Sequence, residues 1–304
     1  MTEASPVAGV WPATWIHGHR RGEPDRDPAI QVHAWDDRTV VLRQSMAVHF
    51  EAPFLFLLFG EDRALLLDTG ATSEPDRFPL WATVDHLVTS WLERHPTEGY
   101  ELVVAHSHAH GDHVAADGQF ADRPGTTVIG HGVDAVRAAF GIEPWPAGDG
   151  SIELGGRRLA VTGIPGHHPA SIAIHDPWTG WLLTGDTVYP GRLYVEDLPA
   201  FVDSLDRLVA WSETRPVTAV VGCHIELSTS PGRDHPIGYP YHPDEPPLAM
   251  TVEQLRHLRD VARSLPDRPA VTDAGDAIIW VGRPLGAVLR QVGRGLAARI
   301  SSGD

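Results

Sequence analysis

One short segment constrains this chain more than any other feature, because it places four candidate metal ligands within six positions. The segment reads Val-Ala-His-Ser-His-Ala-His-Gly-Asp-His over residues 104–113. Its candidate ligands are His108, His110, Asp112 and His113. The apolar run at 102–105 predicts a buried strand, and the end of a strand is rigid enough to aim such a cluster. Neutral imidazoles and carboxylates are the ligands that a borderline divalent ion such as Zn²⁺ prefers.

The spacing inside this segment allows two metal positions. His108 and His110 point to the same side of an extended backbone, because side chains alternate along it. Asp112 and His113 can turn toward a second point. One cluster can therefore serve two metal ions.

Three further candidate ligands lie far along the chain, each just after an apolar run. They are His167 in Pro-Gly-His, Asp186 in Gly-Asp-Thr and His224 in Gly-Cys-His. A polar loop that happens to be rich in histidine is the alternative interpretation of the first segment alone. Agreement among four separate segments favours a metal site.

The hydrophobic pattern predicts an α/β fold. Apolar runs predict strand pairs at 54–59 with 64–67, 151–154 with 158–163 and 171–175 with 181–184, and single strands at 102–105, 126–129, 217–221 and about 277–281. Helical periodicity predicts helices at 82–95, 133–140, about 198–209, 252–265 and 285–300. Hairpins joined to strand-helix units indicate a mixed sheet with helices on its outer faces.

We expect residues 1–304 to form a single domain. Residues 1–50 are interpreted as an irregular N-terminal arm, because residues 1–35 show no sustained period. The Pro- and Gly-rich segment 230–250 is expected to be an active-site loop, and 251–304 to hold C-terminal helices.

Charge and composition disfavour nucleic-acid and membrane partners and bear on the cellular compartment. The chain has 24 Lys and Arg against 40 Asp and Glu, a net charge of −16, which disfavours binding to nucleic acid. It shows no leader pattern and no apolar run that could span a bilayer, so we expect a cytoplasmic protein without a membrane partner. The single cysteine, Cys223, cannot form an intrachain disulfide, which fits a reducing compartment.

The combined motif, His108-x-His110-x-Asp112-His113 with the separate His167, Asp186 and His224, resembles the metallo-β-lactamase superfamily in its glyoxalase II and lactonase branch. The resemblance extends from about Phe54 to His224 and implies a four-layer αββα sandwich. It implies that His108, His110 and His167 bind one metal ion, that Asp112, His113 and His224 bind a second, and that Asp186 bridges them. Two zinc ions per chain are expected, with iron or manganese left open.

The resemblance also implies a metal-dependent hydrolase. A hydroxide bridging the two ions would cleave an ester, lactone, thioester or amide of a small molecule. Asp112 or a metal-bound water could pass on the proton. Tyr189 could hydrogen-bond the substrate carbonyl, although loop packing is its other interpretation, and Tyr194 is a weaker candidate. The alternatives are an oxidoreductase similar to persulfide dioxygenases, with one iron ion, and a non-catalytic binding module.

Several neighbouring residues are assigned supporting roles or left open. Asp68 is expected to orient a ligand imidazole by a hydrogen bond, or else to cap a turn. Cys223 is expected to be a small buried side chain, and His106 to make a hydrogen bond at a strand end. Whether His49 or His242 contacts substrate is open, and a homodimer is possible.

Overall fold

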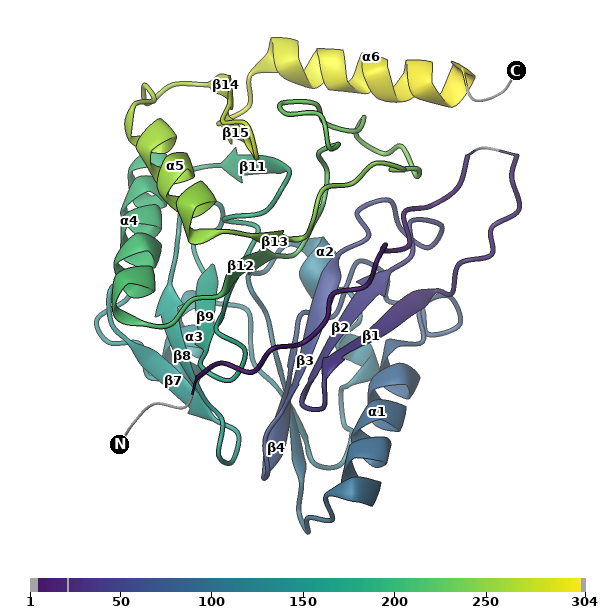
Figure 1. The fold of residues 1–304 in the computed structure, drawn as a ribbon, viewed down its shortest axis with the longest axis vertical. Helices are drawn as coiled ribbons and strands as arrows, with labels where there is room; N and C mark the ends of the chain where they lie inside the picture. Colours follow the sequence, from purple (N-terminus) through teal and green to yellow (C-terminus); the bar gives the residue numbers. More distant parts are fainter. Residues whose placement is uncertain (1–4, 21, 302–304) are drawn as a thin grey trace.

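The molecule is built on two six-stranded sheets that pack face to face (Figure 1). The computed structural model describes residues 5–20 and 22–301. Residues 1–4 and 21 of the expected arm, and residues 302–304, lie outside the described residues. The first sheet has the order β1 (Ile30–Asp36), β2 (Thr39–Gln44), β3 (Phe54–Phe59), β4 (Arg63–Leu67), β5 (Glu101–Ala105) and β6 (Thr126–Val128). The second has the order β13 (Ala249–Met250), β12 (Ala219–Gly222), β10 (Trp181–Gly185), β9 (Ile172–Asp176), β8 (Arg158–Gly163) and β7 (Gly150–Glu153).

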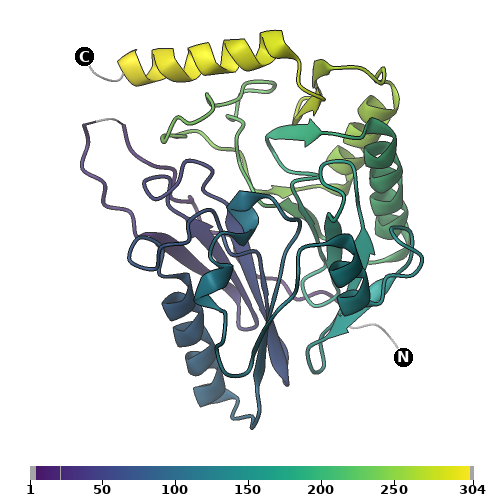
Figure 2. The same ribbon diagram turned by 180° about the vertical axis from the view of Figure 1, so that it is seen from behind.

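Helices cover the outer faces of both sheets. On the first sheet, α1 (Leu80–Arg94) packs Val84 and Trp91 onto the side chains of β3 and β4 that face away from the second sheet. On the second sheet, α4 (Leu198–Thr214) and α5 (Val252–Arg263) lie side by side (Figures 1 and 2). The expected αββα sandwich is confirmed.

The core between the sheets explains the composition of the central strands. β3 reads Phe-Leu-Phe-Leu-Leu-Phe and is buried along its whole length, because one set of alternate residues faces α1 and the other faces the second sheet. A buried ion pair of the second sheet is also hydrogen-bonded across this interface. Arg157 of the β7–β8 turn binds Asp176 of β9 through two hydrogen bonds of 3.1 and 2.6 Å and donates to the carbonyl oxygen of Arg38.

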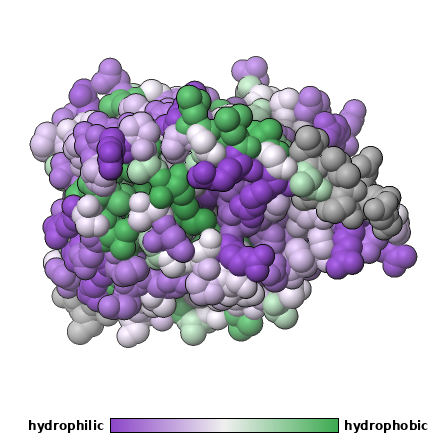
Figure 3. Space-filling view, turned by 90° about the horizontal axis from the view of Figure 1, so that it is seen from above, coloured by the Kyte–Doolittle hydropathy of each residue, from purple (hydrophilic) through white to green (hydrophobic). Residues whose placement is uncertain are grey.

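Smaller elements lie around the sandwich. They are α2 (Gly111–Val114), the 3₁₀ helix η1 (Asp117–Gln119), α3 (Val133–Phe140), the sheet β11 (Arg192–Val195), β15 (Ile278–Val281) and β14 (Ala270–Asp273), and the terminal helix α6 (Leu285–Ser301). From the side on which α6 lies, hydrophobic residues are visible on the surface beside hydrophilic ones (Figure 3). Leu285 and Leu289 of α6 are 77% and 71% exposed. No helix in 5–20 or 22–301 is long and apolar enough to cross a membrane.

The sequence analysis was wrong about part of the N-terminal arm. Residues 30–44, within the expected irregular 1–50, form the antiparallel pair β1 and β2 that extends the first sheet. Strands β11, β13 and β14 were also not predicted, and β14 lies between the two expected C-terminal helices.

The strand directions decide where the candidate ligands meet. β4 and β5 are parallel in one sheet, while β10 and β12 are parallel in the other. β8 runs in the same direction as β10, because each is antiparallel to β9. The segments that follow these strands therefore gather at one edge of the sandwich.

Candidate metal centre

The first group of candidate ligands consists of three histidines whose ring nitrogens converge. His167 Nε2 lies 3.2 Å from His108 Nε2 and 2.9 Å from His110 Nδ1, and the last two atoms are 3.0 Å apart. Three nitrogens bound to one tetrahedral zinc at about 2.0–2.1 Å would lie about 3.3 Å from one another. The three rings are therefore set at separations close to those of a zinc-binding face.

The second group combines two imidazoles with two carboxylates. His224 Nε2 lies 3.3 Å from both His113 Nε2 and Asp112 Oδ2, and His113 Nε2 lies 3.3 Å from the same Asp112 oxygen. Asp186 Oδ1 is 3.4 Å from His224 Nε2 and 3.5 Å from His113 Nε2. This group again offers donor atoms of the kinds that hold Zn²⁺.

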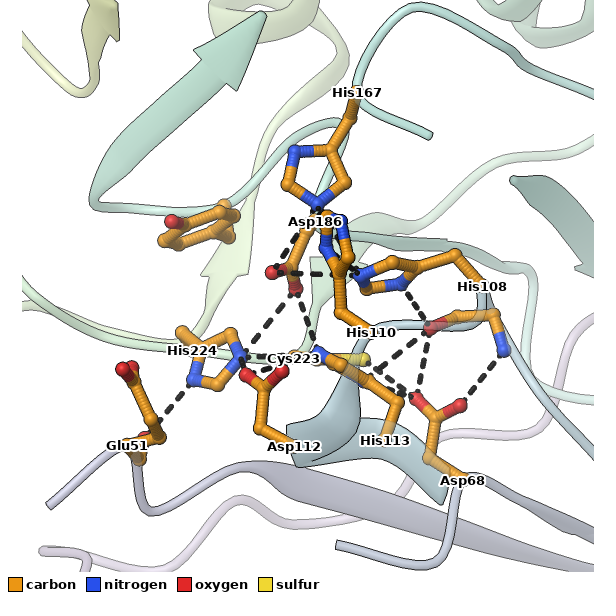
Figure 4. Close-up of polar contacts among 12 residues, drawn as sticks. Glu51, Asp68, His108, His110, Asp112, His113, His167, Asp186, Cys223 and His224 are labelled. Carbon is orange, nitrogen blue, oxygen red and sulfur yellow. Dashed lines mark hydrogen bonds and ion pairs between the residues drawn. The ribbon is translucent and has the colours of Figure 1, made fainter. Parts of the chain in front are cut away.

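Asp186 connects the two groups (Figure 4). Its Oδ1 faces the second group, while its Oδ2 lies 3.8 Å from His167 Nε2 and 4.0 Å from His108 Nε2. Oδ1 is buried without a hydrogen-bond partner among the described residues, which is costly for a carboxylate oxygen unless a cation is present. The arrangement thus fits two metal ions on either side of one carboxylate.

Four of the five candidate histidine ligands are held from behind by a hydrogen bond at Nδ1, the nitrogen that faces away from the group. His113 Nδ1 lies 3.0 Å from Asp68 Oδ2, and His108 Nδ1 lies 3.1 Å from Ser107 Oγ. His167 Nδ1 donates to the carbonyl oxygen of Tyr194 at 2.7 Å. His224 Nδ1 donates to that of Glu51 at 3.0 Å (Figure 4). A proton on Nδ1 leaves Nε2 with the lone pair that binds a metal.

Asp68 has the orienting position that its sequence context suggested. It is fully buried after β4 and accepts hydrogen bonds from the Ser107 amide at 2.7 Å and the Ser107 hydroxyl at 2.9 Å, as well as from His113. Cys223 Sγ lies 3.2 Å from the same carboxylate, and burial raises the pKa of its thiol. Cys223 is thus the small buried neighbour that was expected.

The two ligand groups differ in the pKa values of their histidines. Burial, reinforced by the nearby His113, holds the pKa of His108 well below its usual value, and burial also lowers the pKa of His167. In the second group burial acts in the same direction but is outweighed, because Asp186 and Asp112 raise the pKa of His224 to about 9. The protons held on this group are those that a metal ion would displace.

A cavity of about 490 Å³ opens over the ligands. Its walls include Glu51, Tyr194, Glu226 and Arg283 beside the ligands themselves. Residues 230–250 do not line this cavity themselves, but they lie beside it. Pro236, Ile237, Gly238 and His242 line a smaller adjoining cavity of about 40 Å³ that shares Glu51, Tyr194 and Glu226 with the main one. Neither His49 nor His242 lines the main cavity.

The two tyrosines differ in what their hydroxyl groups contact. Tyr189 is 2% exposed, and its hydroxyl lies within hydrogen-bond distance of the Arg192 carbonyl oxygen and, at 3.0 Å, of Glu226 Oε2. Tyr189 lines the cavity, as Tyr194 does, but these contacts of its hydroxyl favour the packing role left open for it. The Tyr194 hydroxyl instead accepts a hydrogen bond from Arg192 Nε at 3.1 Å, so its own proton is not used in that bond.

Sequence reasoning missed the residues that support the site from other elements. Glu226 accepts from the Arg192 amide at 2.7 Å and pairs with its guanidinium, which fixes β11 along the cavity. In the sequence, the only sign that Glu226 supports the site is its position two residues after His224. Ser107 lies inside the histidine segment but is not itself a metal ligand type.

Comparisons with known proteins agree with this geometry. Residues 51–271 match the family model described as the metallo-beta-lactamase superfamily. The chain is 32% identical over 136 residues to a hydroxyacylglutathione hydrolase of Anaeromyxobacter dehalogenans (strain 2CP-C). The matched region is 45% of this chain and 46% of that relative. It is 28% identical over 202 residues to the hydroxyacylglutathione hydrolase of Ectopseudomonas mendocina (strain ymp), which covers 65% and 74%. The chain spans about half the length of several curated relatives that it matches.

Solved structures show the same fold at low identity. A metallo-beta-lactamase from Erythrobacter litoralis has a TM-score of 0.54 at 14% identity, over 79% of this chain and 99% of that one. The DIM-1 metallo-beta-lactamase has a TM-score of 0.51 at 14% identity over the same shares.

Proposed function

The chain belongs to the metallo-beta-lactamase superfamily, and we propose that it is a metal-dependent hydrolase that holds two zinc ions. The observation that carries the proposal is Asp186, whose two oxygens face two separate ligand groups. A single-iron oxidoreductase would need only one of these groups. The second is complete, with Asp112, His113 and His224 in place, which favours the two-metal hydrolase.

The chemistry divides between the ions and the chain. When bound, the ion pair supplies a hydroxide nucleophile at neutral pH and polarises a substrate carbonyl. Asp112 is the more open of the two ligand carboxylates, with 21% of its side chain exposed against 8% for Asp186, so it is the residue proposed to take up and return the proton. The Tyr194 hydroxyl, which lines the same cavity, is proposed to donate to the carbonyl oxygen.

The proposed substrate is an ester, lactone, thioester or amide of a small molecule, with the thioester first. The relatives described above are named hydroxyacylglutathione hydrolases, which supports a thioester. The net charge of −16 and the cavity carboxylates Glu51 and Glu226 disfavour a nucleic-acid substrate. A cytoplasmic location remains part of this proposal.

One experiment tests both parts. Protein stripped of metal is reloaded with zinc, iron or manganese and assayed on thioesters, lactones, β-lactams and phosphodiesters. We expect two zinc ions at the candidate metal centre of each chain and turnover of a carbonyl substrate. One iron per chain with oxygen consumption would contradict the hydrolase, and cleavage of a phosphodiester would contradict the substrate class.

A further inference from the structure

A second convergence of histidine and aspartate lies outside the metal centre. It involves His106, which follows β5, Asp117, which begins η1, and His131, which follows β6. His106 Nε2 lies 2.9 Å from Asp117 Oδ1, and His131 Nε2 lies 2.7 Å from Asp117 Oδ2. The hydrogen bond expected for His106 is therefore present, but it is one of two that reach the same carboxylate.

The two rings repeat the geometry of the main metal centre. His106 and His131 have ring centroids 4.7 Å apart and planes at 89°. Within the first ligand group, the three pairs of rings each have a centroid separation of 4.7 Å and interplanar angles of 82–86°. Imidazoles in this edge-to-face arrangement can direct one nitrogen each at a shared point.

The carboxylate between the rings is oriented by a separate residue. The Thr69 hydroxyl donates to Asp117 Oδ1 at 2.7 Å, as an outer hydrogen bond does for a ligating carboxylate. The Thr69 amide also donates to the carbonyl oxygen of His113 at 2.7 Å, which connects this cluster to the backbone of the main centre.

Access to the cluster suits an ion that arrives from solvent. The side chain of His106 is 4% exposed, that of Asp117 19% and that of His131 40%. His106 and Asp117 are thus fixed on the inside, while His131 leaves an open side where water can complete a coordination shell.

We propose that His106, Asp117 and His131 form a third metal site, separate from the two-metal centre, that takes a divalent transition metal such as Zn²⁺. Two imidazoles and one carboxylate are a sufficient protein ligand set for such an ion, with water in the remaining position. The one ligand atom that each residue offers lies within 4.8 Å of the other two.

His131→Gln tests the site, and His257→Gln is its matched control. Both histidines are exposed, so neither substitution removes a buried side chain, and His257 lies on α5 away from the cluster. Metal-free wild type and variants are dialysed against a series of free zinc concentrations, and bound zinc per chain is measured. We expect His131→Gln to bind one zinc fewer than wild type and His257→Gln. Equal zinc binding by all three proteins would overturn the proposal.

A crystal of the zinc-loaded wild type provides the second measurement. Anomalous scattering at the zinc edge is expected to show a peak between His106, Asp117 and His131, and a map without that peak would overturn the site. The zinc titration compares variants that share the same main centre. A difference of one bound ion between them therefore does not depend on how fully the main centre is occupied. Loss of the peaks at the main centre alone would contradict the proposed function and leave the third site intact.

Discussion

Replacing Asp68 with Asn tests how the second ligand group is held. The carboxylate is fully buried and accepts from His113 Nδ1, from both the amide and the hydroxyl of Ser107, and from Cys223 Sγ. An amide has one oxygen in place of two. If that oxygen stays opposite the Ser107 amide, the new NH₂ group faces the His113 N–H; if the amide flips, it faces the Ser107 amide N–H.

The size of the effect follows from this conflict. To avoid placing its N–H against the new NH₂ group, His113 must move its proton from Nδ1 to Nε2. Nε2 faces the metal position, so the lone pair needed for metal binding is lost. Loss of such an orienting partner costs about 10–100-fold in metal affinity, or about 1.4–2.8 kcal/mol. The group formed by His108, His110 and His167 is linked to Asp68 only indirectly, through the Ser107 hydroxyl beside His108 Nδ1, so its affinity is expected to fall less.

The assay is a zinc titration of metal-free protein against a competing chelator. Asp176→Asn serves as the control, because Asp176 is an equally buried acid that pairs with Arg157 far from the ligands. We expect Asp68→Asn to weaken one of the two binding steps at the centre more than the other, and Asp176→Asn to weaken neither. Two unchanged steps in Asp68→Asn would refute this account of the hydrogen bond.

Three further predictions concern the cavity, the core and pH. Steady-state kinetics should show that Tyr194→Phe lowers kcat by about 10²-fold with little change in KM, because the proposed donor to the carbonyl oxygen is lost. Tyr189→Phe should keep kcat. Urea unfolding should show that it loses about 1–3 kcal/mol of stability, because buried hydrogen bonds are removed. Arg157→Ala should cost about 3–5 kcal/mol in urea unfolding, and exposed neighbour Arg158→Ala less than about 0.5 kcal/mol; similar losses in both would contradict a role for the buried ion pair. Burial and a neighbouring imidazole lower the pKa of His235 from 6.5 to about 4, so the unfolded chain binds more protons between these values and stability falls as pH falls through this window. His235→Gln should lose about 1–2 kcal/mol less than wild type from pH 7 to 4, after allowance for solvent screening, and equal losses would argue against the shift.

The candidate ligands could be predicted from sequence because each lies directly after a strongly apolar run. In β5 and β12 nearly every side chain is buried, so the hydrophobic pattern marked where each strand ends and where its ligand begins. His108, His167 and His224 lie far apart in the chain, yet strand direction alone brings them to one edge. The same apolar runs predicted a mixed sheet with helices on its outer faces, whereas the αββα sandwich was implied by the resemblance of the ligand motif.

Apart from β2, whose six residues are all buried, the elements that were missed lack such a pattern. β1 buries only Ile30 and Trp35 among its seven residues, and β13 has only two residues. β11 is fixed by the buried contact between Arg192 and Glu226, which lie 34 residues apart. A contact of this kind depends on the finished fold, so local sequence does not reveal it, and β11 was therefore not predicted as part of the cavity wall.

The most direct test is a crystal structure of the zinc-loaded protein with anomalous scattering measured at the zinc edge. The account predicts two peaks about 3.5–4 Å apart, one among His108, His110 and His167 and the other beside Asp112, His113 and His224. The carboxylate of Asp186 should lie between them with one oxygen toward each. A single peak, or two peaks with Asp186 turned away from both, would contradict it.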